Sequence, residues 1–298
     1  MTPDTPLVSI ITPVYNGAYT IRRTIESIRE QDYPRIEHIV MDAGSTDGTL
    51  DILRSYADRL TWFSEPDKGQ SDALNTGFAR ATGSYLTWLN ADDVLRPGGI
   101  SRCLQVFTEN PDVALVFGRL DWIDRDGNYL KDDHNVRDGT YEDLMRGDNF
   151  ISQSGNLFTR EAWETCGPLD INLHYCMDVD LWIKIMQRYP IKYTPQVFAA
   201  LGVYPETKSA AGGLPRFEEI RQMIESHGGG ASSTYYKIGL WYYQHNQMRE
   251  ARRHFQIALA RDPNPIIQRR LLSLTLKSYL GGPVVTLGRT LRSQLTHK

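Results

Sequence analysis

The chain has 298 residues, 41% of them hydrophobic and 23% charged, which are the proportions of an ordinary globular protein and exclude a largely disordered one. The net charge of −3 argues against a nucleic-acid-binding protein, although residues 249–298 hold ten Lys or Arg against only two acids. Three cysteines without a CxxC pair favour a reducing compartment over a disulfide framework.

The N-terminus, MTPDTPLVSIITPVYN, lacks the basic and long apolar regions of a secretory signal peptide. No stretch approaches the roughly 18 apolar residues of a membrane-spanning helix. We therefore expect a cytoplasmic protein, either soluble or peripherally bound at the inner face of the membrane.

Apolar runs alternate with helical patterns in the first ninety or so residues. The runs at 7–12, 36–41, 60–64 and 85–89 predict strands, and apolar residues at helical spacing predict helices over 19–31, around 50–53 and over 70–81. Strands that alternate with helices predict an α/β fold with a mostly parallel sheet covered on both faces. In such sheets ligands bind beyond the carboxyl ends of the strands.

Polar residues follow each of the four predicted strands. In strand order they are Pro13, Tyr15 and Asn16; Asp42; Glu65, Asp67 and Lys68; and Asn90, Asp92 and Asp93. A single aspartate at a strand end is commonly turn chemistry, but together these side chains predict an acidic cleft. Because proteins often hold Mg²⁺ or Mn²⁺ through one or two carboxylates beside substrate phosphates, the adjacent Asp92 and Asp93 predict a divalent metal and a nucleotide.

Five motifs, in this order, resemble the family 2 glycosyltransferases of the GT-A fold. They are PVYN (13–16), MDAGSTDGT (41–49), GQSDALNTGF (69–78), WLNADD (88–93) and MDVDLWIKI (177–185). The resemblance spans about residues 7–210 and implies a Rossmann-like GT-A catalytic domain over residues 1–212. It further implies inverting, metal-dependent transfer of a sugar from a nucleotide-sugar, expected to be a UDP-sugar, to an acceptor hydroxyl.

The resemblance also implies roles for individual residues. Tyr15 is expected to stack on the nucleobase and Asp42 to hydrogen-bond it. Asn90-Ala91-Asp92 stands at the family's D-x-D motif, so Asp92 is the expected metal ligand and Asp93 a neighbour of the donor sugar or the metal. The full set of donor-binding candidates is Pro13, Tyr15, Asn16, Asp42, Lys68, Asp72, Asn90, Asp93 and Lys208.

Asp178 matches the position of the family's catalytic base. Glycosyl transfer passes through an oxocarbenium-like transition state, so it needs a base on the acceptor side and charge neutralisation on the leaving side. Asp178 would take the proton of the acceptor hydroxyl. The alternative is that Asp178 caps the helix predicted over 180–189, a role that Asp180 fits better.

Three positions depart from the family pattern. Leu74 stands where many members have an arginine, and Met177 replaces the usual Glu before the base. Tyr204 lies where relatives often have a histidine, and four residues later Lys208 is either a phosphate contact or a solvated lysine. With Asn90 in place of an acid, we expect the metal to bind weakly until the diphosphate of the donor arrives.

Residues 119–176 are the expected region of acceptor recognition. The Asp-Gly pair at 126–127 predicts a hairpin at the edge of the sheet. Asp121, Trp122, Gln153 and Asn156 are candidates for a sugar pocket, although Trp122 suits a core position equally well.

From residue 213 onward the sequence predicts helices only. A helix is expected over 214–227, a flexible break at 228–233, and a helix pair over about 232–265 that resembles one tetratricopeptide repeat and could bind a protein partner. A lone pair cannot bury its apolar face, so it should pack on the catalytic domain, on residues 266–280 or on a partner. The basic segment 266–298 has two interpretations: an amphipathic surface on an anionic membrane near a lipid-linked acceptor, or a solvated face of a packed helix.

Three other functions are weighed against transfer. A degenerate adaptor that binds a protein through its helices is disfavoured because Asp42, Asp92, Asp93 and Asp178 occur together. A nucleotidyltransferase would carry a glycine-rich basic loop near the N-terminus, and a dinucleotide oxidoreductase a GxGxxG motif; the sequence has neither.

Overall fold

The computed structural model describes residues 5–279 and divides the chain into two compact units. The first comprises the residues up to Tyr141 together with Asn149–Ala211. The second comprises Glu142–Asp148 and the residues from Gly212 onward. No helix within the described part of the chain is long and apolar enough to cross a membrane.

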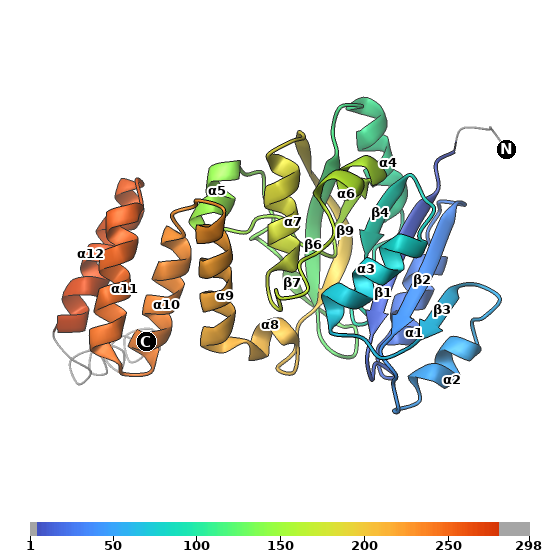
Figure 1. The fold of residues 1–298 in the computed structure, drawn as a ribbon, viewed down its shortest axis with the longest axis horizontal. Helices are drawn as coiled ribbons and strands as arrows, with labels where there is room; N and C mark the ends of the chain where they lie inside the picture. The colour runs from blue at the N-terminus through green and yellow to red at the C-terminus, as the bar shows by residue number, and fades with distance from the viewer. Residues whose placement is uncertain (1–4, 280–298) are drawn as a thin grey trace, which may run out of the picture. The chain divides into compact units, whose positions relative to one another are not determined.

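One mixed sheet forms the centre of the first unit (Figure 1). Its strands are β1 (Val8–Val14), β2 (Ile36–Asp42), β3 (Thr61–Ser64), β4 (Tyr85–Trp88), β5 (Val94–Leu95), β6 (Leu115–Ile123), β7 (Tyr129–Asp132), β8 (Asn156–Thr159) and β9 (Ile191–Gly202). Their order is β3-β2-β1-β4-β8-β6-β9-β5, with β7 paired to β6. β3, β2, β1 and β4 run parallel, and β6 and β9 run in the same direction because β8 is antiparallel to both β4 and β6. Six strands therefore end at one rim.

Helices cover both faces of the sheet. They are α1 (Ile21–Arg29), α2 (Thr49–Arg54), α3 (Gln70–Arg80), α4 (Gly99–Glu109), α6 (Arg160–Cys166) and α7 (Met177–Met186). The short α8 (Lys208–Ala211) comes after β9. Because successive strand residues point to opposite faces, Val14 and Val40 pack with α1 and α2, whereas Ile11 and Met41 face Gly77 of α3.

Contacts between aromatic rings show which face of the sheet each of the other helices covers. Phe78 of α3 contacts Trp88 of β4 and Trp163 of α6, and Trp182 of α7 stacks on Trp88. α3, α6 and α7 thus share one face. Phe107 of α4 meets Tyr85, which is three residues before Trp88 and points the other way, so α4 lies on the face of α1 and α2.

The four predicted strands, the three predicted helices and the mostly parallel sheet are confirmed, with ends shifted by one or two residues. The hairpin at 126–127 is also confirmed, since β6 pairs with β7 across that turn. Of its two strands, β6 lies inside the sheet between β8 and β9. Among the described strands β7 pairs with β6 alone, on the side that β8 leaves open beyond Phe117, so β7 forms an edge of the sheet there.

The second unit is helical. It contains α5 (Tyr141–Arg146), of which all but Tyr141 belong here, α9 (Gly213–Ser226), α10 (Ser232–Gln244), α11 (Met248–Arg261) and α12 (Pro265–Tyr279). α10 and α11 form the predicted pair, and a Cβ added to Gly239 would lie 2.6 Å from the Phe255 ring, so this glycine permits their close contact. α12 packs on α11, which is one of the three arrangements that were open for the pair. The likeness to a tetratricopeptide repeat stays a prediction.

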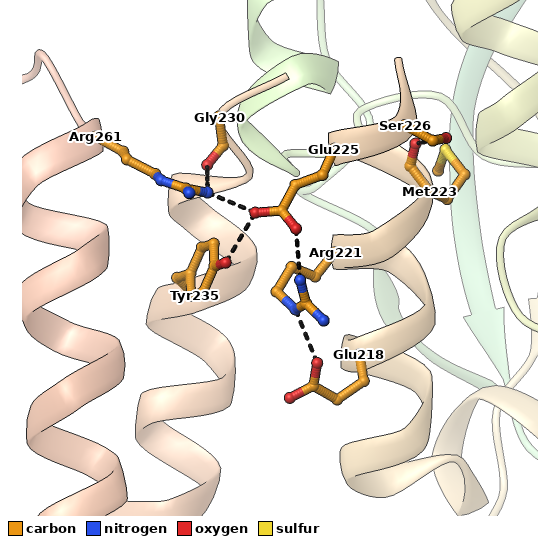
Figure 2. A network of polar contacts seen from close by, with 8 residues as sticks. All are labelled: Glu218, Arg221, Met223, Glu225, Ser226, Gly230, Tyr235 and Arg261. Carbon is orange, nitrogen blue, oxygen red and sulfur yellow. Dashed lines mark hydrogen bonds and ion pairs between the residues drawn. The ribbon is translucent and has the colours of Figure 1, made fainter. Parts of the chain in front are cut away.

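A polar network ties α9 to the pair (Figure 2). The Glu225 carboxylate accepts hydrogen bonds from Arg221 one turn earlier, from the Tyr235 hydroxyl at 2.8 Å and from Arg261 at 2.6 Å. Arg261 also donates to the Gly230 carbonyl at 3.2 Å, which holds the turn between α9 and α10. The segment 228–233, predicted as a flexible break, is therefore held by this hydrogen bond at Gly230.

Candidate active site

Tyr15 and Asn16 follow β1 at the rim. The Tyr15 ring is 66% exposed, as a residue that stacks on a planar ligand requires. Asn16 has a positive φ of 51° and is held at both ends: its N–H donates to Ser45 Oγ at 2.7 Å, and its Oδ1 accepts from the Thr46 N–H at 2.9 Å. The side chain of Asn16 therefore fixes the neighbouring 42–49 turn. Pro13 is buried inside β1, opposite Met41.

Asp42 ends β2 and is only 2% exposed. Its Oδ2 accepts three hydrogen bonds, from the N–H groups of Gly44 and Ser45 and from Ser64 Oγ. Its Oδ1 is buried and has no hydrogen-bond partner within the described residues. Asp42 also lines a pocket of about 50 Å³ beside Glu65, Pro66 and Asp72. Since a buried acceptor without a donor costs free energy, this pocket suits a ligand that brings an N–H.

Lys68 and Asp72 shape the start of α3. The Lys68 backbone N–H donates to the Asp72 carboxylate at 3.0 Å, which satisfies one of the free donors that precede a helix. Asp72 therefore has a structural role as well as a place in the pocket beside Asp42. Direct contact of either residue with a donor stays a prediction.

A chain of side-chain hydrogen bonds joins four segments at the rim. Lys208 Nζ donates to Gln70 Oε1 at 3.0 Å, and Gln70 Nε2 donates to Asn90 Oδ1 at 2.8 Å. Asn90 Nδ2 donates to Gln153 Oε1 at 2.7 Å, and Gln153 donates to the Trp88 carbonyl at 2.6 Å. The structure thus brings Lys208 to the D-x-D position, 118 residues away in the sequence.

The adjacent carboxylates of Asp92 and Asp93 lie in different environments. Asp92 is partly exposed, and its Oδ2 accepts from the Tyr204 hydroxyl at 2.8 Å. Asp93 is 1% exposed, and its oxygens accept from the Gly202 N–H at 2.9 Å and from Ser154 Oγ at 2.5 Å. Burial raises the pKa of both carboxyls. Asp93 ties the end of β4 to β9, so Asp92 is the better placed of the two to meet a ligand.

Asp178 is the second residue of α7, whose N-cap is Cys176, so Asp178 is not the cap. Asp180 is 5% exposed and forms an ion pair with Lys184 at 2.6 Å. Trp182 stacks on Trp88 with ring centroids 5.6 Å apart. Because residues four apart share a helix face, Asp178 lies one turn from this contact, on the face of α7 that meets the end of β4.

Most of the residues predicted to line a pocket for the acceptor sugar make other contacts in the structure. Asp121 forms an ion pair with Arg96 at 2.7 Å, and Trp122 lies in β6 under the Lys131 ammonium. Asn156 is 5% exposed, and its side chain donates to two backbone carbonyls of the loop that precedes β8. Gln153 is the candidate from this group that hydrogen-bonds a rim residue, Asn90.

Sequence reasoning noted Tyr204 as a departure from the family pattern, but it did not place Tyr204, Arg125 or Arg23 near Asp92. Tyr204 follows β9, and the turn around Arg125 follows β6; both strands end at the same rim as β4. Arg23 of α1 joins them, because its Nη1 donates to the Arg125 carbonyl at 3.0 Å. The positive charge at 23 and 125 was visible in the sequence, but the pairing of β6 with β9 was not.

A family model described as Glycosyl transferase family 2 matches residues 9–165, more than half of the chain. The chain belongs to glycosyl transferase family 2. Membership of this family makes it a glycosyltransferase. Its similarity to individual glycosyltransferases extends beyond the residues that the family model matches. An uncharacterised glycosyltransferase of Rickettsia typhi is 31% identical over 228 residues, covering 72% of this chain and 70% of that protein.

Other relatives are longer than this transferase. The chondroitin synthase of Escherichia coli is 32% identical over 195 residues, which are 64% of this chain but 28% of the synthase. An uncharacterised glycosyltransferase of Rickettsia felis is likewise matched over 33% of its length. The chain spans about a third or less of these two relatives.

Solved structures confirm the GT-A-like fold of the transferase. TarS of S. aureus, in complex with UDP-GlcNAc, superposes with a TM-score of 0.60 over 92% of this chain and 89% of that chain, at 13% identity. The mannosyltransferase PcManGT of Pyrobaculum calidifontis, in complex with GDP-Man and Mn²⁺, superposes with a TM-score of 0.59 over 96% and 84%, at 24% identity. At these identities the likeness concerns the fold alone.

The residues at the rim fit a divalent metal only in part. Among the described residues, no group of three or more His, Cys, Asp or Glu side chains is arranged to hold a metal ion. Asp92 keeps Oδ1 free of hydrogen bonds from any other described residue, so it offers one carboxylate oxygen. Because Mg²⁺ and Mn²⁺ are commonly bound by one or two carboxylates plus substrate phosphates, the transferase fits a metal that binds together with a diphosphate.

Replacing Asp93 should remove a pH dependence of stability. Burial and the charge of Asp92 raise the pKa of Asp93 to about 8, whereas an unfolded aspartate titrates near about 3.9. Between these pH values the native state holds one proton more, so stability falls as pH rises, by about 1.4 kcal/mol per pH unit. Asp93→Asn cannot ionise and keeps the size of the side chain. We expect its free energy of unfolding in urea, without added metal, to exceed that of the wild type increasingly from pH 5 to pH 8.

The exposed Asp112 gives the matched control. Asp112→Asn should follow the wild-type curve. Parallel pH profiles of Asp93→Asn and the wild type would show that Asp93 is ionised in the native protein.

Proposed function

We propose that this transferase moves a sugar from a UDP-sugar to an acceptor hydroxyl by a metal-dependent, inverting reaction. The observation that carries the proposal is the distribution of three carboxylates over the rim. Asp42 ends β2 at the pocket, Asp92 follows β4, and Asp178 stands at the start of α7. A nucleotide-sugar needs these three contacts in that order: base, diphosphate and reacting sugar.

Asp42 supports the choice of nucleobase. Asp42 lines the pocket, its buried Oδ1 has no hydrogen-bond partner within the described residues, and the exposed Tyr15 follows the neighbouring strand β1. The imide N–H of uracil is a single donor that meets one carboxylate oxygen, and the ring would stack on Tyr15. Guanine also presents ring N–H donors, so the GDP-sugar of the mannosyltransferase neighbour is the competing donor class.

The leaving group departs as a nucleoside diphosphate. We assign Asp92 as the protein ligand of a Mn²⁺ or Mg²⁺ ion that would neutralise the charge of the diphosphate when bound. Lys208 adds a positive point charge for the phosphates or for the donor sugar. It is connected to Asn90 through the side chain of Gln70.

Asp178 acts on the other side of the reacting carbon. In a single displacement the acceptor oxygen attacks the anomeric carbon as the bond to the diphosphate oxygen breaks, and Asp178 takes the hydroxyl proton. One carboxylate suffices for this step. The configuration of the anomeric carbon inverts.

A donor screen tests the proposal. UDP-, GDP- and dTDP-sugars are titrated by calorimetry and assayed for release of the nucleoside diphosphate, with and without Mn²⁺. We expect Mn²⁺-dependent binding and slow hydrolysis of a UDP-sugar. No binding of any nucleotide-sugar would favour the catalytically idle adaptor, which the family membership and the intact Asp42, Asp92 and Asp178 do not favour.

We further propose that the product is a surface polysaccharide or another glycoconjugate, built on a saccharide or lipid-linked acceptor at the membrane. The chondroitin synthase name of one relative supports a polysaccharide. The exposed face of α12 supports a membrane: it carries Ile266, Leu272, Leu276 and Tyr279, exposed by 77%, 49%, 66% and 60%, beside the exposed basic residues Arg269, Arg270 and Lys277. This segment contains no acid. The rest of the basic segment, from Leu280 on, lies outside the described residues.

Flotation with vesicles checks the membrane contact. We expect the full chain to float with vesicles that contain phosphatidylglycerol and to stay in solution with pure phosphatidylcholine, because basic residues gain free energy near an anionic surface. The double variant Leu272→Gln/Leu276→Gln should float less. Leu130→Gln, which changes a leucine of the first unit as exposed as Leu272, is the control. Equal flotation of all three proteins would contradict the proposal.

A further inference from the structure

Two arginines meet at the rim beside Asp92. Arg23 lies in the first turn of α1, and Arg125 lies in the turn between β6 and β7. Arg23 Nη1 donates to the Arg125 carbonyl at 3.0 Å, and the Tyr19 hydroxyl donates to the Asp126 carboxylate of the same turn. These contacts fix the turn on the start of α1.

Arg23 acts on the candidate metal ligand, Asp92, through its charge, and Arg125 is connected to Asp92 through Tyr204. Thr24, the neighbour of Arg23, donates from Oγ1 to the Asp93 carbonyl at 2.7 Å, which places the first turn of α1 against the Asp92–Asp93 turn. The Arg125 guanidinium lies 4.7 Å from the Tyr19 ring centroid and 5.9 Å from that of Tyr204. The hydroxyl of Tyr204 in turn donates to Asp92. The positive charge of Arg23 also acts to lower the pKa of Asp92 against the effect of burial.

The protein leaves much of the hydrogen-bonding capacity of these arginines unused. Neither forms an ion pair within 4.0 Å of an acid in the described part of the chain. Nε and Nη2 of Arg23 are buried and have no hydrogen-bond partner there, and Arg125 is exposed. A guanidinium has five N–H donors suited to phosphate oxygens, and leaving buried donors unpaired costs free energy. The arrangement suits an anionic ligand.

The geometry of an inverting displacement indicates which anion this is. The attacking and leaving oxygens stand on opposite sides of the anomeric carbon. Asp178, the proposed base, comes from α7 on one face of the sheet, whereas Arg23 comes from α1 on the other face. The arginines therefore stand on the side of the leaving group. Leu74, fully buried in α3, cannot supply charge there.

We propose that Arg125 contacts the diphosphate of the donor and that Arg23 positions Arg125 and adds a second positive charge beside Asp92. The proposal rests on the function proposed above. Apart from Lys68 and Lys208, the rim carries the acids Asp42, Asp92 and Asp178, and a diphosphate brings further negative charge. The arginine pair shares its neutralisation with the metal, so the transferase can bind a diphosphate with a single carboxylate in its metal site.

Binding of nucleoside diphosphate and nucleoside separates this role from a structural one. UDP and uridine, or GDP and guanosine if the donor screen selects GDP, are titrated with Mn²⁺ into the wild type, Arg125→Gln and Arg23→Gln at low and high salt. We expect each variant to bind the diphosphate about tenfold more weakly at low salt, and the difference to shrink at high salt because the interaction is ionic. Affinity for the nucleoside should not change. Arg23→Lys, which keeps the charge, should recover part of the loss.

Arg22→Gln is the matched control. It removes the same charge from the adjacent residue, whose Nη1 donates to the Tyr56 hydroxyl at 3.1 Å, and it should bind the diphosphate like the wild type. If the wild type binds the diphosphate and both variants bind it equally well, the arginine pair has no such role. Equal losses for diphosphate and nucleoside would also overturn it, because they indicate a distorted base pocket. If the wild type binds no nucleotide at all, the proposed function itself fails.

Discussion

Asp178→Asn should lower turnover by roughly 10² to 10⁴-fold while leaving the affinity for the donor unchanged. The amide cannot take a proton from the acceptor hydroxyl, but it keeps the size of the side chain at the start of α7. The contact between Trp182 and Trp88, which fixes this end of the helix, is untouched. Steady-state transfer rates and donor titrations, measured on the same preparations, check both halves of the expectation.

Asp170→Asn serves as the control for this prediction. Asp170 is an exposed aspartate in the loop that precedes α7, so the variant should transfer sugar like the wild type. Thermal unfolding of both variants shows whether the fold is kept. Wild-type turnover in Asp178→Asn would remove Asp178 from the role of base and direct attention to Asp180, although its ion pair with Lys184 makes it a poor candidate.

Asp92→Ala should abolish the part of donor binding that depends on metal. Within the described residues no other acid of the rim combines solvent access with a free carboxylate oxygen next to Asn90, because Asp93 is buried and bonded at both oxygens. We expect the dissociation constant for the donor with Mn²⁺ to rise at least about 10²-fold, to the value measured without metal. Calorimetry with and without Mn²⁺ gives both values.

Two companion variants sharpen this test. Tyr204→Phe removes the hydroxyl that donates to Asp92 at 2.8 Å and leaves the carboxylate in place, so metal dependence should persist. Asp112→Asn, far along the chain in an exposed loop, should change nothing. Metal-dependent donor binding that survives in Asp92→Ala would place the metal ligand elsewhere.

The part of the rim formed by the ends of β1 to β4 could be predicted from the sequence because each of these strands is visible in a short local pattern. Each of the strands β1 to β4 is an apolar run followed at once by polar residues, and parallel strands bring their ends together. Asp42 and Asp92 were found in this way. The same reasoning could not separate Asp92 from Asp93, because the pattern does not show which of two adjacent carboxylates faces the interior.

The part of the rim formed by the ends of β6 and β9 depends on pairing between strands that are far apart in the sequence. β6 continues the direction of β4 only because β8, more than 30 residues later, lies antiparallel between them, and β9 then pairs with β6. Tyr204 and Arg125 reach the rim through these pairings. No periodicity in the sequence indicates such a register, so their contacts with Asp92 and α1 became visible only in the structure.

The configuration of the product tests the central claim most directly. With a donor whose anomeric carbon is α, the sugar released or transferred is followed by ¹H NMR from the first minutes, before mutarotation mixes the anomers. A single displacement, with Asp178 on one side of the sugar and the diphosphate on the other, predicts that the β anomer forms first and that Asp178→Asn forms it at a strongly reduced rate. Initial formation of the α anomer would contradict the account.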